Sequence, residues 1–174
     1  MGFGHMDHLR SLAFSPTKGD KLLSASDDKT AQICDVATGK QLWVLKGHKD
    51  WIRSAAWSPD GKYVVTASDD SSIRFWELGN QSSSENQSQP DPIVILDGIH
   101  GGFHVMTVAF SPNGKYVISG GSDGNLIIWE KVVEQDWKRK HEPLMGHTEK
   151  VVSVLVTPDS KYVLSDSVDC TLRG

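Results

Sequence analysis

The sequence predicts an all-β fold in which short antiparallel strands are grouped into repeated four-stranded units around a common axis. A repeated motif carries this prediction: a hydroxyl residue, an Asp four positions later, and a large residue six positions after the Asp. The motif recurs as Ser24, Asp28 and Cys34; Thr66, Asp70 and Trp76; Ser119, Asp123 and Trp129; and Ser165 and Asp169, whose closing position falls just beyond Gly174. The copies follow one another at intervals of roughly 43 to 53 residues, the range of a four-stranded propeller blade. Four consecutive blades of a β-propeller are therefore expected, with the fourth incomplete and the ring unfinished.

The second copy shows how the motif divides into strands. We expect its four strands at residues 52–57, 62–67, 73–76 and 94–96. The second of them is rich in β-branched residues, which favour strands. The turn before it ends in Asp60-Gly61, where Gly61 accepts a positive φ without steric cost. No stretch of the sequence predicts a helix.

The other copies fit the same template, so the whole chain 1–174 is expected to be one propeller segment. The expected blades are residues 5–46, 47–97, 98–145 and 146–174. Residues 79–92 are polar and low in complexity, which predicts a flexible loop between two strands of the second blade. Residues 130–142 occupy the equivalent place in the third blade, and their Val and Trp side chains suggest packing against the blade edge.

Composition argues against several classes of function. The formal net charge of −4 disfavours nucleic acid as a partner, since phosphate binding requires a concentrated basic surface. The short basic run at residues 138–141 is typical of a solvated loop. Cys34 and Cys170 do not form a disulfide framework, and no apolar run is long enough to cross a membrane. We expect a cytoplasmic protein, with a nuclear location as the alternative.

These motifs resemble those of the WD-repeat family. The resemblance rests on Gly47-His48, on residues 58–62 and 66–70, and on Phe75-Trp76-Glu77, with their counterparts in the other copies. It implies a hydrogen-bonded tetrad in each blade that links a loop His, a hydroxyl, an Asp and a Trp. The implied members are His5, Ser24 and Asp28; His48, Thr66, Asp70 and Trp76; His100, Ser119, Asp123 and Trp129; and His147, Ser165 and Asp169. Cys34 replaces the first Trp, and His100 serves only if its loop absorbs one extra residue.

The same residue types suggest chemistry that the repeat argues against. A Ser, a His and an Asp together are typical of a hydrolase triad, but a catalytic set is needed once and this one recurs in every blade. His100 and His104 have a spacing that pairs metal ligands on a helix, whereas this segment is expected to be a loop. We therefore expect no catalytic residue, no metal and no cofactor.

The resemblance also implies where partners bind. Exposed contacts are expected at the third and fifth residues after each loop His, counted one position later in the third copy because of the extra residue in its loop, and at the residue before each turn Asp. These are His8, Arg10 and Asp27; Trp51, Arg53 and Asp69; His104, Met106 and Ser122; and Lys150, Val152 and Val168. Trp51 and Arg53 stand out because Trp and Arg are enriched in interface hot spots. The alternative is that the Trp51 ring packs on the neighbouring blade.

Taken together, the sequence predicts a non-catalytic scaffold that docks other proteins or peptides through its loops, with no nucleic-acid or membrane partner. One alternative is a half-propeller that homodimerises into an eight-bladed ring. Another is a sensor segment of a larger NTPase-type signalling protein, in which case the chain is a fragment of a longer propeller.

Overall fold

The computed structural model describes residues 4–79, 89–133 and 136–174, and these residues form strands and turns without any helix. The first sheet contains β1 (Leu9–Phe14), β2 (Lys21–Ser26), β3 (Thr30–Asp35) and β4 (Gln41–Lys46). The second contains β5 (Ile52–Trp57), β6 (Tyr63–Ser68), β7 (Ser72–Glu77) and β8 (Pro92–Asp97). The third contains β9 (Val105–Phe110), β10 (Tyr116–Gly121), β11 (Leu126–Val133) and β12 (Asp136–Arg139). The fourth contains β13 (Val151–Val156), β14 (Val163–Ser167) and β15 (Leu172–Arg173).

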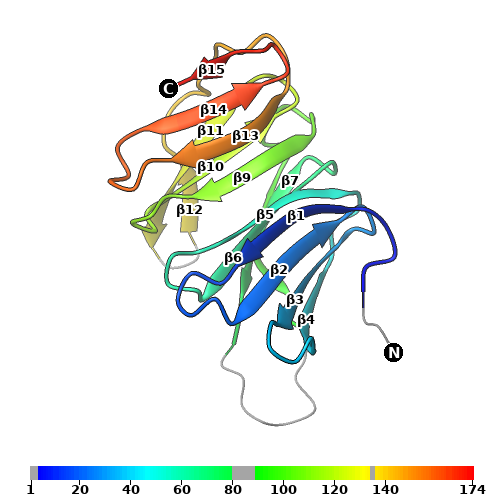
Figure 1. Ribbon diagram of the computed structural model, residues 1–174. Coiled ribbons are helices and arrows are strands. Elements are labelled where there is room, and N and C mark those ends of the chain that lie inside the picture. Colours follow the sequence, from blue (N-terminus) through cyan, green and yellow to red (C-terminus); the bar gives the residue numbers. More distant parts are fainter. Residues whose placement is uncertain (1–3, 80–88, 134–135) are drawn as a thin grey trace.

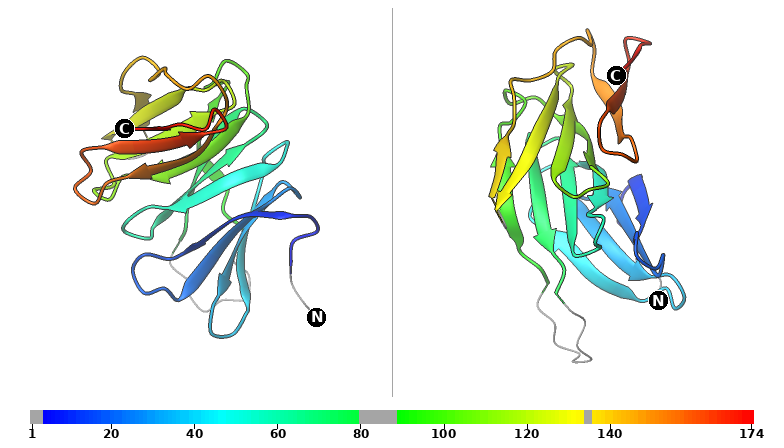
Figure 2. Two further views of the ribbon diagram at one scale, coloured as in Figure 1. Left: turned by 45° about the horizontal axis from the view of Figure 1, so that its top comes forward. Right: turned by 90° about the vertical axis from the view of Figure 1, so that its left-hand side faces the viewer.

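Within each sheet, every strand pairs antiparallel with the next strand in the chain, so each sheet is a meander. The first strand of each sheet contacts the first strand of the next, which arranges the four sheets along an arc (Figure 1). The arc stays open, with the first and fourth sheets at its two ends (Figure 2). The all-β prediction of four consecutive blades around an unclosed ring is thus confirmed.

Apolar side chains fill the spaces between neighbouring sheets. Leu23, Ile33 and Ile52 are fully buried between the first two sheets. Between the second and third, Phe75 stacks on Trp137 with ring centroids 4.8 Å apart. Smaller aliphatic side chains such as Ile118 and Val154 form the cluster between the third and fourth sheets. The hydrophobic packing between blades therefore holds the arc together.

The structure treats differently the two segments that the sequence predicts as insertions, residues 79–92 and residues 130–142. The expected flexible loop falls largely on residues 80–88, which lie outside the described residues. At its far end, the side chain of Gln89 accepts a 2.5 Å hydrogen bond from the backbone N–H of Val44. Residues 130–142 were expected to be an insertion at the blade edge, but they include the end of β11 and all of β12. Trp137 is only 9% exposed on β12, so its burial fixes a fourth strand that the sequence pattern did not reveal.

Candidate functional site

The tetrad of the second sheet connects a loop to two strands through a line of hydrogen bonds. His48 Nδ1 lies 2.8 Å from Asp70 Oδ2, and its Nε2 lies 2.8 Å from Thr66 Oγ1. The indole N–H of Trp76 donates to the same Thr66 oxygen at 2.9 Å. A hydroxyl holds one proton, so Thr66 donates to His48 and accepts from Trp76, and His48 donates its Nδ1–H to Asp70. This assignment requires a neutral imidazole.

Burial supports the neutral form of this imidazole. Burial lowers the pKa of His48, although the Asp70 carboxylate opposes the shift. Burial alone would raise the pKa of Asp70, but hydrogen bonds from His48, Ser72 and the backbone together hold it well below its usual range. The pair is therefore a neutral imidazole that donates to an ionised carboxylate, and both nitrogens of the ring are engaged.

The third sheet builds an equivalent tetrad despite its longer loop. His100 Nδ1 lies 2.9 Å from Asp123 Oδ1, and Nε2 lies 3.1 Å from Ser119 Oγ, to which Trp129 donates at 3.0 Å. The structure thus brings His100 into the line. Both of its ring nitrogens are occupied, which leaves neither for a metal ion shared with His104.

The extra residue in this loop is accommodated by a glycine on β10. A Cβ added to Gly121 would lie 2.3 Å from both His100 Nδ1 and Asp123 Oδ1. The corresponding positions of the other sheets carry serines whose hydroxyls donate to loop carbonyls: Ser26 to Asp7, Ser68 to Asp50 and Ser167 to Glu149. The shifted imidazole therefore needs the space that a side chain occupies in the other three blades.

The first and fourth sheets contain the His, hydroxyl and Asp members of the hydrogen-bonded line without a Trp. His5 lies 2.8 Å from both Asp28 Oδ2 and Ser24 Oγ, but Cys34 supplies no indole N–H to that serine. His147 lies 3.0 Å from both Asp169 Oδ2 and Ser165 Oγ. Only the second and third sheets thus contain all four members among the described residues.

Sequence reasoning missed a further member of each line. The side chain of the residue two positions after each Asp donates a hydrogen bond to that carboxylate. This bond stabilises the turn between the second and third strands of the sheet. The donors are Thr30, Ser72, Asn125 and Thr171, at 2.7, 2.6, 2.9 and 2.6 Å respectively. The sequence pattern that could have revealed them is a hydroxyl or amide side chain two positions after the Asp in all four copies.

One backbone hydrogen bond in each sheet brings the expected docking positions together. The N–H of the residue before the turn Asp donates to the carbonyl of the third residue after the loop His, or of the fourth residue in the third sheet, whose loop has one extra residue. The four pairs are Asp27 and His8 at 3.0 Å, Asp69 and Trp51 at 2.9 Å, Ser122 and His104 at 2.9 Å, and Val168 and Lys150 at 3.1 Å. These positions line one edge of the sheets, which we call the loop face.

On the loop face, Trp51 lies close to two arginines from neighbouring sheets. The guanidinium carbon of Arg53 is 4.8 Å from the Trp51 ring centroid, and that of Arg10, on β1, is 5.6 Å away. The ring is nevertheless 39% exposed. Trp51 thus contacts the neighbouring blade and still presents part of its ring to solvent.

Each arginine is fixed by a nearly buried aspartate. Arg53 donates through Nε and Nη2 to Asp69 at 2.9 and 2.5 Å, and Asp69 also lies 3.5 Å from His104 Nδ1. Arg10 donates through Nε and Nη2 to both oxygens of Asp27, and this contact raises the pKa of Arg10. Fork-shaped contacts of this kind hold guanidinium planes in place. We call Arg10, Trp51, Arg53 and their two aspartates the Arg–Trp–Arg stack.

The remaining predicted docking residues surround this stack less tightly. His8 is exposed and its Nδ1 lies 2.8 Å from Asp7 Oδ1. Asp7, His8 and Asp27 bring possible metal-ligating atoms within 4.8 Å of one another, but Arg10 already takes both Asp27 oxygens. Met106 is half-buried in the place where the first two sheets carry arginine. The acid–arginine pair is thus limited to the first two sheets within the described part of the chain.

The geometry defines a class of protein: consecutive propeller blades, each fastened by a His–hydroxyl–Asp line and presenting loops on one face. The family model for "WD domain, G-beta repeat" matches residues 2–35, 39–77, 92–130 and 137–173. The chain therefore belongs to the WD-repeat family, whose repeats generally form protein-interaction modules.

Curated relatives with similar sequences carry different names. Nuclear distribution protein PAC1 of Coccidioides posadasii (strain C735) is 32% identical over 174 residues, covering 92% of this chain and 35% of its own length. Coronin-7 of Mus musculus is 37% identical over 67% of this chain and 12% of its own length. Polycomb protein EED of Chaetomium thermophilum is 35% identical over 62% of this chain and 18% of its own length. The chain thus spans well under half the length of these relatives.

Proposed function

We propose that the chain is a non-catalytic docking module that binds a protein or peptide partner on the loop face, with the Arg–Trp–Arg stack as the central contact. The observation that carries this proposal is the partly exposed Trp51, whose ring lies within 6 Å of two guanidinium groups that are each held by an aspartate. Trp and Arg are the side chains enriched in interface hot spots, and such residues gather near interface centres. The free thiols of Cys34 and Cys170 fit a reducing compartment, cytoplasmic or nuclear.

The stack is arranged to bind at low entropic cost. A side chain that is already held in its bound position loses little freedom when a partner arrives. The side chains of Asp69 and Asp27 are 5% and 2% exposed, so each arginine is held in position by a nearly buried carboxylate. The partner therefore contacts the exposed part of the Trp51 ring and the guanidinium groups of Arg10 and Arg53.

A second function, assembly with another copy, is favoured by a separate observation. Leu12 and Phe14 on β1 are 60% and 62% exposed at one end of the arc. Leu155 and Leu172 are 65% and 71% exposed in the fourth sheet, at the other end. Apolar flanks of this kind are typical of surfaces that associate. Two arcs joined end to end would cover both.

The docking proposal is tested by partner capture from lysate with the Trp51→Ala, Arg53→Ala double variant. We expect the variant to lose captured proteins that the unmodified chain retains, while its circular dichroism spectrum stays the same. The matched control is Tyr162→Ala with Arg139→Ala, another exposed aromatic residue and arginine, located away from the loop face; Tyr162 is 63% exposed. Equal capture by the double variant and the unmodified chain would show that the docking surface lies elsewhere.

A further inference from the structure

Arg74 is a buried cation in the third strand of the second sheet. It lies on β7, where it pairs with Thr66 of β6, and the residue is 7% exposed. Within the described part of the chain, its Nε is the one buried side-chain nitrogen or oxygen that has no hydrogen-bond partner. A guanidinium carries five N–H donors and stays protonated in proteins, so burial without hydrogen bonds costs free energy. A buried group of this kind requires an explanation.

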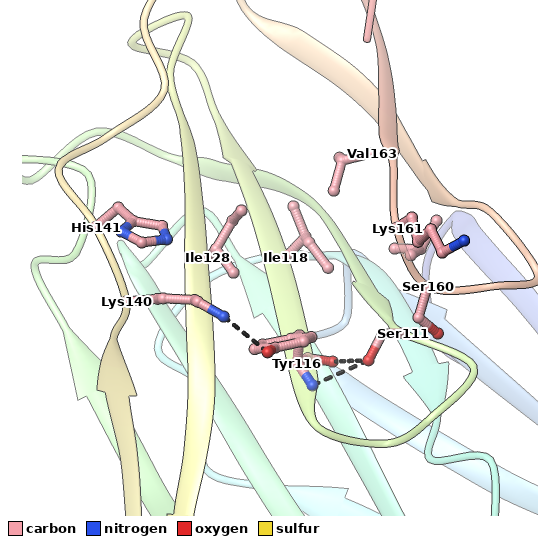
Figure 3. A pocket seen from close by; sticks show the side chains of 10 residues that line it. Ser111, Tyr116, Ile118, Ile128, Lys140, His141, Ser160, Lys161 and Val163 are labelled. Carbon is pink, nitrogen blue, oxygen red and sulfur yellow. Dashed lines mark hydrogen bonds between the residues drawn. The ribbon is translucent and has the colours of Figure 1, made fainter.

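Cations elsewhere in the described chain show the usual alternative, which is a hydrogen bond. Both arginines of the Arg–Trp–Arg stack donate to aspartates. Lys140 donates from Nζ to Tyr116 Oη at 2.7 Å, and both residues line the cavity between the third and fourth sheets (Figure 3). Arg74 instead approaches Asp70, whose Oδ2 lies 3.7 Å from its Nη2. This distance is too long for a hydrogen bond, so Arg74 acts on its surroundings through its charge.

The guanidinium group of Arg74 lies against the backbone just before His48. A Cβ added to Gly47 would lie 2.6 Å from Arg74 Nη1, so the cation covers this glycine closely. The ring of His48 is buried next to it and hydrogen-bonds Asp70 in the tetrad of the second sheet. A permanent positive charge therefore lies beside a histidine that could take up a second one.

The charged groups that act on His48 come from the elements packed around it. Burial and the positive charge of Arg74 on β7 lower the pKa of His48. Asp70 in the turn before β7 and Asp97 at the end of β8 act in the opposite direction. Lys49, the next residue along the chain, has an exposed side chain. Arg74 thus opposes two carboxylates that favour the protonated ring.

The third sheet offers the same tetrad without a cation. The residues that occupy the place of Arg74 in the first, third and fourth sheets, each paired with the tetrad hydroxyl, are Gln32, Ile127 and Arg173. Ile127 is uncharged and 2% exposed, whereas Arg173 is exposed to solvent. For His100, burial lowers the pKa and Asp123 raises it, with no contribution from a cation of the described residues. The second sheet is therefore the one described sheet that buries a positive charge beside its tetrad.

We propose that Arg74 is a positioning residue for the tetrad of the second sheet, whose buried guanidinium keeps His48 neutral by disfavouring a second positive charge beside it. The neutral ring accepts the Thr66 proton at Nε2 and donates its Nδ1–H to Asp70, so the line of hydrogen bonds stays complete. The same charge makes this sheet sensitive to acid. In the unfolded chain His48 is free of Arg74 and takes up a proton more readily.

Two variants of the full chain separate the charge of Arg74 from its packing. Arg74→Met keeps an unbranched side chain and removes the charge, and Arg74→Lys keeps the charge. The histidine pKa values are followed by pH titration in carbon–proton NMR spectra of the isotope-labelled chain. We expect Arg74→Met to raise the pKa of His48 and to leave that of His100 unmoved, whereas Arg74→Lys should keep the pKa of His48 low. Arg139→Met, at an exposed arginine of β12, is the control and should change neither value.

Denaturant titrations between about pH 7.5 and pH 5.5 supply a second readout. The unmodified chain loses stability as the pH falls through this range, because the folded chain binds the proton less readily than the unfolded chain. A higher folded pKa of His48 in Arg74→Met makes this loss smaller. A merely structural role of Arg74 would lower the free energy of unfolding equally at every pH.

Sucrose, which stabilises folded chains, is present in all samples so that the variants remain folded. An unchanged pKa of His48 in Arg74→Met, or a parallel pH dependence of its stability, would overturn the proposal. An Arg74→Lys variant that behaves like Arg74→Met would overturn it as well. Loss of the fold at neutral pH in Arg74→Met alone would do the same, because Arg74 would then support the whole sheet and not the protonation state of one histidine.

Discussion

Trp76 donates its indole N–H to Thr66 across 2.9 Å, whereas Cys34 occupies the equivalent position in the first sheet and gives the hydroxyl of Ser24 no such bond. The two sheets therefore differ in how completely their buried polar groups are satisfied. A fully connected network is rigid and costly to break, because each lost member leaves its partners unpaired in a site of low dielectric.

We predict that Asp70→Ala destabilises the chain by about 1–3 kcal/mol, the cost of leaving buried partners unsatisfied. Asp28→Ala should cost less, because the first sheet already lacks one bond of its line. The free energy of unfolding is measured by denaturant titration of both variants. Equal losses would contradict the argument that a complete tetrad carries more stability than a partial one.

Gly121→Ala should be among the most destabilising small substitutions in this protein. The new methyl group would lie 2.3 Å from both His100 Nδ1 and Asp123 Oδ1 and would force that pair apart. Overpacking and the loss of buried hydrogen bonds together predict a loss of about 2–4 kcal/mol. Gly79→Ala is the control, since nothing lies within 4 Å of the position that its methyl group would take, and its effect should stay within about 0.5 kcal/mol. A thermally unchanged Gly121→Ala variant would show that the loop of His100 can move away.

Stability should fall as the pH drops below about 6.5, the ordinary pKa of histidine. Burial lowers the pKa of His48 and of His100 in the folded chain. The unfolded chain therefore binds protons first, and the stabilisation that is complete above about pH 6.5 is lost progressively as the pH falls toward the folded pKa values. Each histidine contributes at most about 1.4 kcal/mol per pH unit.

Denaturant titrations between about pH 7.5 and pH 5.5 measure this slope. His48→Gln should reduce it if the variant folds, and His8→Gln, at an exposed site, should leave it unchanged. A free energy of unfolding that does not change over this range would show that the imidazoles bind protons equally in the folded and the unfolded chain.

Sequence periodicity predicted the sheets well because strand pairs and turns repeat with local residue patterns. The tetrads were implied by the WD-repeat resemblance and not by periodicity. Periodicity failed at β12, where only the burial of Trp137 marks the strand. It also missed the dependence of His100 on Gly121, which arises from the extra residue in one loop, and the approach of Arg10 to Trp51, which is a contact between two repeats.

The last prediction concerns the apolar flank of β1. Leu12 and Phe14 point to the same side of the strand, since side chains alternate along a strand. The matching residues of β5, Ala55 and Trp57, are 6% and 8% exposed because the first sheet covers them, whereas Leu12 and Phe14 are 60% and 62% exposed. Each exposed side chain of this size gains about 1.5–3 kcal/mol on full burial, so association that covers both is favourable.

We therefore expect light scattering of the purified chain to give a mass above 19.1 kDa that rises with concentration. Leu12→Ser with Phe14→Ser should lower this mass toward that of the monomer. Val132→Ser with Val133→Ser, two exposed residues at the end of β11, should leave it unchanged. A monodisperse monomer at high concentration with cooperative unfolding would mean that exposing the apolar side chains of β1 to water costs little free energy. The proposed assembly function would then be wrong.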